Sequence, residues 1–234
     1  MVEQLVLSTA GNYQELDEYL LKYHVHHIFL VCGSSIKQLN IGKYFKKLEA
    51  RTGIIVTQFS DFQSNPLYES AVEGVNKFHE SHADMIIAVG GGSGVDVAKC
   101  IKLYCNMDRS KNYLFQTIVP NDIPFLAVPT TAGTGSEATR YAVLYYEGAK
   151  QSISDYSCIP SAVLFDPSCL KTLPLYQKKS TMMDTLCHAI ESFWSVNSTD
   201  ESKEYSRVAI KLVLDNMQAY LNYIDEGNAA MLRA

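Results

Sequence analysis

One stretch, from Asp84 to Lys99, constrains the fold of this chain more than any other. Its apolar residues stop at Gly90-Gly91-Gly92, and apolar residues at helical spacing follow. The pattern predicts a strand, a turn and a helix. Because glycine lacks a Cβ atom, backbone N–H groups in the turn can approach a ligand, and the helix N-terminus favours an anion such as a pyrophosphate. Ser93 and Asp96 also have the spacing of a capping box, so a plain helix start is the alternative interpretation.

The position of these glycines departs from the ordinary dinucleotide fingerprint, which places Gly-x-Gly-x-x-Gly after the first strand. Here the glycines follow the third expected strand. A second glycine-rich stretch, 133–138, has the fingerprint spacing, but a strand pattern at 141–146 follows it instead of a helix. Neither stretch ends in Gly-Lys-Ser/Thr, which argues against a nucleoside-triphosphatase.

The rest of the first three quarters of the chain alternates between helical and strand patterns. We expect helices over 12–23, 36–50, 66–80 and 95–104, and strands over 27–32, 53–59, 84–89, 125–129 and 161–165. Such alternation, opening here with a helix, predicts a parallel sheet. After Leu173-Pro174 only helical patterns remain, over 175–194 and 201–223. The expected organisation is an α/β dinucleotide-binding domain over 1–174, followed by the start of a helical metal-binding domain over 175–234.

Composition narrows the classes of partner. The net charge is −5 and no basic cluster alternates with aromatic residues, which argues against nucleic acid and anionic membranes. No apolar run approaches the roughly 20 residues that cross a bilayer, and the N-terminus lacks the pattern of a signal segment. The six cysteines are scattered without CxxC spacing, as expected for reduced thiols. We therefore expect a cytoplasmic protein that acts on small molecules.

Two further segments carry residues suited to a nucleotide. Gly33 and Ser34 end the first strand where a carboxylate would hydrogen-bond the ribose 2′-OH of NAD; because no carboxylate is present, NADP(H) is permitted, and an ordinary turn is the alternative. In the loop 130–137, seven of eight residues are small or hydroxylic. Such a loop can surround a phosphate or a nicotinamide, whereas a flexible linker is the alternative. Arg140 and Lys150 flank the next strand and offer cations.

Asp184 and His188 are four residues apart on an expected helix, so their side chains share one face. A carboxylate oxygen and an imidazole nitrogen so placed can bind one divalent cation. An ion-paired Asp and His is the commoner explanation of this spacing.

Three motifs together resemble those of the iron-containing (group III) alcohol dehydrogenases. They are Gly90-Gly91-Gly92-Ser93 with Asp96, Pro129-Thr130-Thr131-Ala132-Gly133-Thr134-Gly135-Ser136-Glu137, and Met183-Asp184 with His188-Ala189-Ile190-Glu191, in the family's order. The resemblance implies a dinucleotide bound between an α/β domain and a helical domain. It implies cofactor contacts by Gly91, Gly92, Ser93, Asp96, Thr130, Thr131, Thr134, Ser136, Asn65, Lys150 and Leu173, and Gly33-Ser34-Ser35 resembles members that accept NADPH.

The resemblance also implies a metal site. Asp184 and His188 match the first two ligands, which suit Fe²⁺ or Zn²⁺. The family adds two later histidines, and this sequence reaches Ala234 without a match to them. We therefore expect a truncated helical domain.

The segment 173–199 is similar to phosphonoacetaldehyde reductases, and Arg140 is the residue expected to pair with a phosphonate. An ordinary surface arginine is the alternative interpretation of Arg140. The expected activity is metal-dependent reduction of a small aldehyde by NAD(P)H, with NADPH favoured, in a homodimer formed through the edge of the first domain. Two other functions remain open: a dehydroquinate-synthase-like lyase that uses NAD and a metal without net redox change, and a nucleotide-binding protein without catalysis.

Overall fold

A computed structural model describes residues 4–9 and 12–234, and its contacts divide the chain into two compact units. The first, which we call the α/β unit, comprises Met1–Pro129 and Ser136–Phe165. The second, the helical unit, comprises Thr130–Gly135 and Asp166–Ala234. The short segment Thr130–Gly135 thus packs with helices that follow it by more than forty residues.

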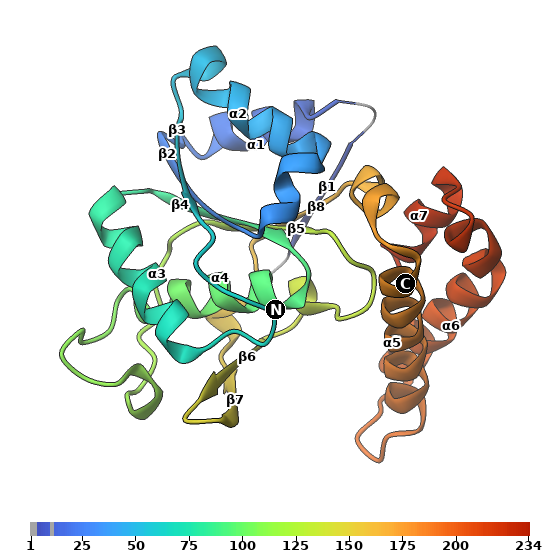
Figure 1. Cartoon of the computed structure of the whole chain (residues 1–234). Coiled ribbons are helices and arrows are strands. Elements are labelled where there is room, and N and C mark those ends of the chain that lie inside the picture. Colours follow the sequence, from blue (N-terminus) through green and yellow to red (C-terminus); the bar gives the residue numbers. More distant parts are fainter. Residues whose placement is uncertain (1–3, 10–11) are drawn as a thin grey trace. The chain divides into compact units, whose positions relative to one another are not determined.

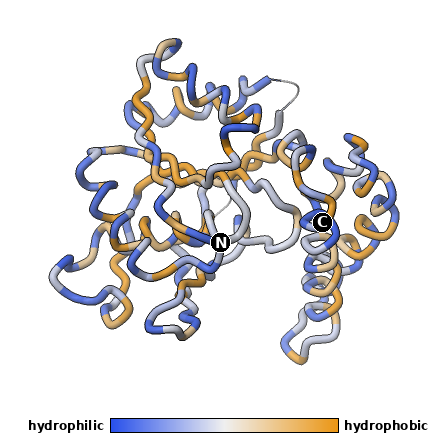
Figure 2. Tube along the Cα trace, in the orientation of Figure 1, coloured by the Kyte–Doolittle hydropathy of each residue, from blue (hydrophilic) through white to orange (hydrophobic). Residues whose placement is uncertain are grey.

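A six-stranded parallel sheet forms the centre of the α/β unit (Figure 1). Its strands are β1 (Leu5–Ser8), β2 (His27–Cys32), β3 (Ile55–Phe59), β4 (Met85–Gly90), β5 (Phe125–Pro129) and β8 (Ala162–Phe165), in the spatial order β1-β8-β5-β4-β2-β3. The central strands are buried on both faces, as their continuous apolar sequences require. The hydrophobic colouring in Figure 2 follows these strands. The predicted fold class, a parallel α/β sheet followed by a helical region, is confirmed.

Helices cover both faces of this sheet. They are α1 (Gln14–Lys22) and α2 (Asn40–Thr52) on one face, and α3 (Tyr68–Ser81) and α4 (Gly92–Tyr104) on the other (Figure 1). The single helix predicted over 36–50 is wrong in one respect: a 3₁₀ turn, η1 (Ser34–Gln38), precedes α2, and Leu39 between them is extended. Gly42 permits the tight join, because a Cβ there would lie 2.0 Å from the Ile36 carbonyl oxygen.

Two β elements were not predicted. The chain opens with β1 and not with a helix; β1 is a four-residue edge strand with only Leu7 buried, so it carries no alternating pattern. The expected strand at 141–146 is present as β6 (Tyr141–Tyr146), and it pairs with the unpredicted β7 (Ala149–Ser154) in an antiparallel hairpin. The α/β unit also contains two 3₁₀ turns, η2 (Tyr113–Phe115) and η4 (Tyr156–Cys158), and a third, η3 (Ser136–Ala138), precedes β6.

The helical unit contains η5 (Pro167–Thr172), α5 (Leu175–Trp194), α6 (Asp200–Leu221) and α7 (Asp225–Met231). A capping box at Thr199 and Ser202 starts α6. The fully buried Lys178 of α5 joins the three helices: its ammonium donates to the Tyr220 carbonyl (2.9 Å) and to Asn228 Oδ1 (2.8 Å). Among the residues that the structure describes, no helix combines the length and apolar character needed to cross a membrane.

Candidate functional site

The glycine turn has the strand-turn-helix structure that its sequence predicts. Strand β4 ends at Gly90, Gly91 is the N-cap residue of α4, and the helix begins at Gly92. The capping-box alternative at Ser93 is wrong, because the helix begins one residue before Ser93 and the cap makes no side-chain hydrogen bond. Gly91 has no side chain that could accept hydrogen bonds from the N–H groups of the first turn of α4. A bound anion can accept these hydrogen bonds instead.

Asp96 lies one turn further along α4 and is engaged by the protein. The Ser136 hydroxyl donates to Asp96 Oδ1 (2.6 Å), and the Val143 amide donates to Oδ2 (3.1 Å). Burial raises the pKa of Asp96, while the Ser136 hydrogen bond and the positive charges of Lys99 and Lys150 oppose the rise. The structure therefore brings Asp96 and Ser136 together, and the cofactor contacts expected of both stay predictions.

Gly33 and Ser34 lie at the C-terminal end of β2, beside the glycine turn, since Cys32 pairs with Val89 in the parallel register. Gly33 has an extended backbone (φ −79°, ψ 175°), and a Cβ there would meet nothing within 4 Å. Neither the backbone nor packing requires glycine at this position. A residue with a Cβ atom is therefore accommodated at position 33.

Asn65 and Lys150 are both connected to Tyr145 of the β6–β7 hairpin. Asn65 adopts a left-handed conformation (φ 55°), and the next residue, Pro66, accepts a hydrogen bond at its carbonyl from the Tyr145 amide (2.8 Å). Tyr145 is opposite Lys150 in the hairpin register. Lys150 thus lies in the β6–β7 hairpin and Asn65 is next to a residue bonded to it. The same hairpin donates the Val143 amide to Asp96.

Arg140, the residue expected to bind a phosphonate, lies in the α/β unit between two tyrosine rings. Its guanidinium carbon is 5.2 Å from the ring centroid of Tyr141 and 4.7 Å from that of Tyr156. Its Nη2 also donates to the Tyr141 hydroxyl (3.1 Å). These contacts hold the guanidinium plane in one orientation.

The remaining predicted residues belong to the helical unit. Gly133 contacts α5 so closely that a Cβ would lie 2.8 Å from the Thr181 carbonyl oxygen and 3.0 Å from its Cβ. The Gly133 carbonyl is 3.3 Å from His188 Nδ1. Of the other predicted residues of this unit, Thr130 is buried and Leu173, at the end of η5, accepts a hydrogen bond from the Tyr223 hydroxyl (3.1 Å).

Asp184 and His188 have geometry that fits two ligands of one metal ion. Asp184 Oδ1 and His188 Nε2 are 3.7 Å apart, and both side chains are about half exposed, at 43% and 56%. The Gly133 carbonyl can only accept a hydrogen bond, so His188 faces it with Nδ1 as the donor and faces Asp184 with Nε2, the nitrogen left for a metal ion. In residues 4–9 and 12–234, no group of three or more His, Cys, Asp or Glu side chains is placed to hold a metal. Asp184 and His188 are therefore a partial ligand set.

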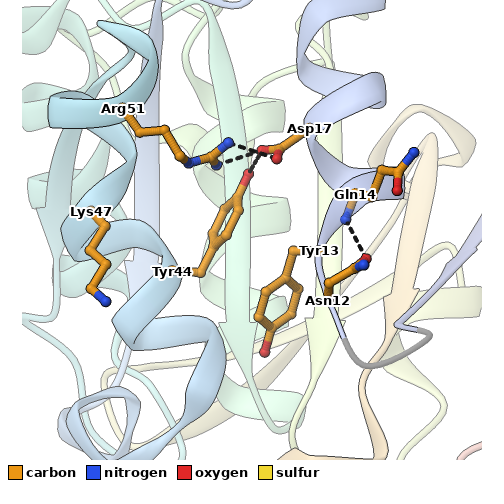
Figure 3. Close-up of a pocket in the computed structure, with 7 residues that line it drawn as sticks. All are labelled: Asn12, Tyr13, Gln14, Asp17, Tyr44, Lys47 and Arg51. Carbon is orange, nitrogen blue, oxygen red and sulfur yellow. Dashed lines mark hydrogen bonds and ion pairs between the residues drawn. The ribbon is translucent and has the colours of Figure 1, made fainter.

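A pocket of about 360 Å³ between α1 and α2 contains none of the predicted residues (Figure 3). Its carboxylate, Asp17, accepts two hydrogen bonds from Arg51 (2.6 and 2.7 Å) and one from the Tyr44 hydroxyl (2.6 Å). The Asp17 carboxylate, the charged group of this pocket, is thus already satisfied by hydrogen bonds from the protein.

Sequence reasoning missed one residue and one contact that shape the candidate site. Lys99 is fully buried in α4, where a lysine within an apolar helical sequence was the available signal. The close contact of Gly133 with Thr181 was also missed. Glycine-rich loops give no local signal for the helix against which they pack.

Comparisons with known proteins agree with the motifs. The sequence profile described as "Iron-containing alcohol dehydrogenase" matches residues 4–167, and that described as "Fe-containing alcohol dehydrogenase family, C-terminal" matches residues 178–233. An aldehyde-alcohol dehydrogenase of Streptococcus pneumoniae is 30% identical, over 89% of this chain and 26% of the relative. An NAD-dependent methanol dehydrogenase of Bacillus methanolicus is 28% identical, over 87% of this chain and 54% of the relative.

Among solved structures, the sulfoacetaldehyde reductase of Bifidobacterium kashiwanohense in complex with NAD⁺ has a TM-score of 0.87 and 26% identity, over 98% of this chain and 64% of that protein. The chain thus spans less than two thirds of the length of each of these three relatives. The matched profiles cover both the α/β unit and the helices that follow it. The chain belongs to the iron-containing alcohol dehydrogenase family.

Proposed function

We propose that this chain binds NAD(P)H and serves in the metal-dependent reduction of a small aldehyde to a primary alcohol. One contact carries the proposal: the Gly133 carbonyl lies 3.3 Å from His188 Nδ1. This contact joins the hydroxyl-rich loop, which suits a nicotinamide, to a side chain that suits a metal. A hydride donor and a carbonyl-activating cation must both be close to the aldehyde carbon, so a link between their binding elements supports this chemistry.

Each residue has a role in this proposal that follows from its own chemistry. The backbone N–H groups of Gly91, Gly92 and Ser93 bind the pyrophosphate at the start of α4. The hydroxyls of Thr130, Thr131 and Thr134 donate to the cofactor from the loop. Asp184 and His188 hold the metal ion, which when bound supplies a Lewis acid for the carbonyl oxygen. The Gly133 carbonyl keeps the proton on His188 Nδ1 and so leaves Nε2 for the metal.

The proposed substrate is a small aldehyde with an anionic group, with phosphonoacetaldehyde as the first compound to test. A related structure is that of a sulfoacetaldehyde reductase, a protein named for an aldehyde with a similarly placed anion. Arg140 would pair with the phosphonate, because its guanidinium plane is oriented by Tyr141 and Tyr156.

The direct test is anaerobic oxidation of NADPH and NADH by the chain with Fe²⁺ or Zn²⁺, using phosphonoacetaldehyde and acetaldehyde in parallel. We expect cofactor oxidation in proportion to aldehyde consumed, with phosphonoacetaldehyde preferred. Aldehyde-independent elimination chemistry without cofactor oxidation would indicate the lyase class. Cofactor binding without oxidation would indicate a nucleotide-binding protein, and absence of binding would contradict the proposal as a whole.

The form of the cofactor can be tested at Gly33. We propose that wild type binds NADPH at least as tightly as NADH, and we expect Gly33→Asp to shift the ratio of the two dissociation constants toward NADH by about tenfold or more. A carboxylate there would hydrogen-bond a ribose 2′-OH and repel a 2′-phosphate. A Cβ at Gly33 would meet nothing within 4 Å, so the substitution can be made without a clash at that atom.

Fluorescence titration of both cofactors measures this ratio. Gly33→Asn is the matched control, because it has a similar shape without the charge, and its shift should be smaller. An unchanged ratio in Gly33→Asp would show that the 2′ position of the ribose lies elsewhere.

A further inference from the structure

Helix α4 carries a buried lysine that the proposed chemistry does not use. Lys99 is 0% exposed, and its ammonium donates to the Thr139 carbonyl (2.7 Å), the Thr139 hydroxyl (3.1 Å) and the Tyr141 carbonyl (2.7 Å). Burial lowers the pKa of Lys99. A buried ammonium is costly unless its donors are satisfied, and here all three have acceptors in one short segment.

The same segment is bound by the carboxylate one turn earlier on α4. Asp96 accepts from the Ser136 hydroxyl and from the Val143 amide through its two separate oxygens. Asp96 and Lys99 therefore make five hydrogen bonds to the residues 136–143, which we call the exit segment because it begins at the end of the hydroxyl-rich loop. Both residues and the exit segment lie within the α/β unit.

We propose that Asp96 and Lys99 are positioning residues that hold the exit segment at a fixed place relative to the N-terminus of α4. With it they hold Ser136 and Glu137, the end of the hydroxyl-rich loop 130–137, which we call the cofactor loop. This inference rests on the proposed cofactor site. The glycine turn would bind the pyrophosphate at the first turn of α4, and Asp96 and Lys99 connect the next turns of that helix to the exit segment. Because both residues are charged and their contacts are buried, they fix the exit segment to α4 before a ligand arrives.

The geometry also favours a positioning role over direct ligand contact for Asp96. Both of its oxygens already accept hydrogen bonds from protein donors. A carboxylate directed at a pyrophosphate would repel it. Asp96 therefore contributes to affinity through the Ser136 and Val143 contacts.

The α4 helix supplies its own control for an experiment. Lys102, one turn after Lys99, is 5% exposed and donates to the Asn121 carbonyl (3.0 Å) and Asn121 Oδ1 (2.9 Å). Its burial also lowers its pKa. Lys102 thus has the same chemistry as Lys99 in the same helix but binds a segment outside the cofactor loop.

The test compares Lys99→Met with Lys102→Met by NADPH fluorescence titration and thermal unfolding. We expect both variants to lose thermal stability, but only Lys99→Met to raise the NADPH dissociation constant, by about tenfold. Hydrogen exchange in peptides covering 136–143 should quicken in Lys99→Met alone. Equal dissociation constants for the two variants would overturn the inference.

A second pair of variants separates positioning from contact at Asp96. Asp96→Asn keeps an oxygen for the Val143 amide and an amide for Ser136, so we expect NADPH affinity within about threefold of wild type. Asp96→Ala removes both bonds and should behave like Lys99→Met. Equal losses in the two Asp96 variants would indicate that the charge itself acts on the ligand. If wild type binds no NADPH, the proposed function fails instead, and that result is distinct from every outcome for the variants.

Discussion

Replacement of Lys178 by methionine is expected to lower the free energy of unfolding by about 2 kcal/mol more at pH 9.5 than at pH 7. Lys178 is fully buried between α5, α6 and α7, with the ring centroids of Tyr220 and Tyr223 at 4.1 and 4.2 Å from its ammonium. Burial lowers the pKa of Lys178 to about 8, against an ordinary value of 10.5. Each pH unit between these values is worth about 1.4 kcal/mol.

The sign of this effect follows from the lowered pKa. Above pH 8 the folded protein releases the Lys178 proton, whereas the unfolded chain keeps it until about pH 10.5, so this group adds stability as the pH rises. Neutral Lys178 still donates to Tyr220 and Asn228. At pH 7, methionine removes the cost of burying the Lys178 charge. At any pH, however, it leaves the Tyr220 carbonyl and Asn228 Oδ1 without their donor, which lowers the free energy of unfolding by about 1–3 kcal/mol for each acceptor.

Urea unfolding followed by circular dichroism at pH 7 and pH 9.5 measures the difference. Lys179→Met is the matched control, because Lys179 is the next residue and is exposed, so its substitution should have the same small effect at both pH values. The comparison of variants at each pH removes the titration of all other groups. A pH-independent difference between wild type and Lys178→Met would show that Lys178 keeps its ordinary pKa in the folded protein.

The features that sequence predicted correctly are those with a local pattern. The consecutive residues from Met85 through the glycine turn into α4 have the sequence patterns of a strand, a turn and a helix, and the structure has all three. The shared face of Asp184 and His188 follows from helical periodicity alone. Parallel strands buried on both faces likewise have continuous apolar sequences.

The features that sequence could not predict depend on distant partners or on weak patterns. Lys99 and Lys178 are charged residues in helices, and their acceptors lie about forty to fifty residues away. Strand β1 has one buried residue, and α7 has seven residues with two acidic residues in its first turn, so neither shows a clear period. The capping-box interpretation of Ser93 and Asp96 failed because Ser136 and Val143 bind the carboxylate that the local motif would have used.

The candidate site depends most on one of these distant contacts, between Gly133 and α5. We expect Gly133→Ala to weaken the binding of Zn²⁺ or Fe²⁺ by about tenfold or more, the range observed when a partner that orients a ligand is lost. A Cβ at residue 133 would lie 2.8 Å from the Thr181 carbonyl oxygen, which is fixed in the backbone of α5, so the loop must move away. His188 Nδ1 then loses the Gly133 carbonyl as its acceptor.

Two measurements follow this change without relying on activity. Nitrogen NMR of the His188 imidazole should report the Nδ1-protonated tautomer in wild type and a mixture of tautomers in Gly133→Ala, and calorimetric titration gives the metal affinity. Gly33→Ala is the matched control, because a Cβ at Gly33 meets nothing within 4 Å and should leave both measurements unchanged. If Gly133→Ala kept the wild-type tautomer and metal affinity, the loop would not orient His188. The proposed link between the cofactor loop and the metal ligand would then be wrong, whereas the glycine turn and its predicted anion site would be unaffected.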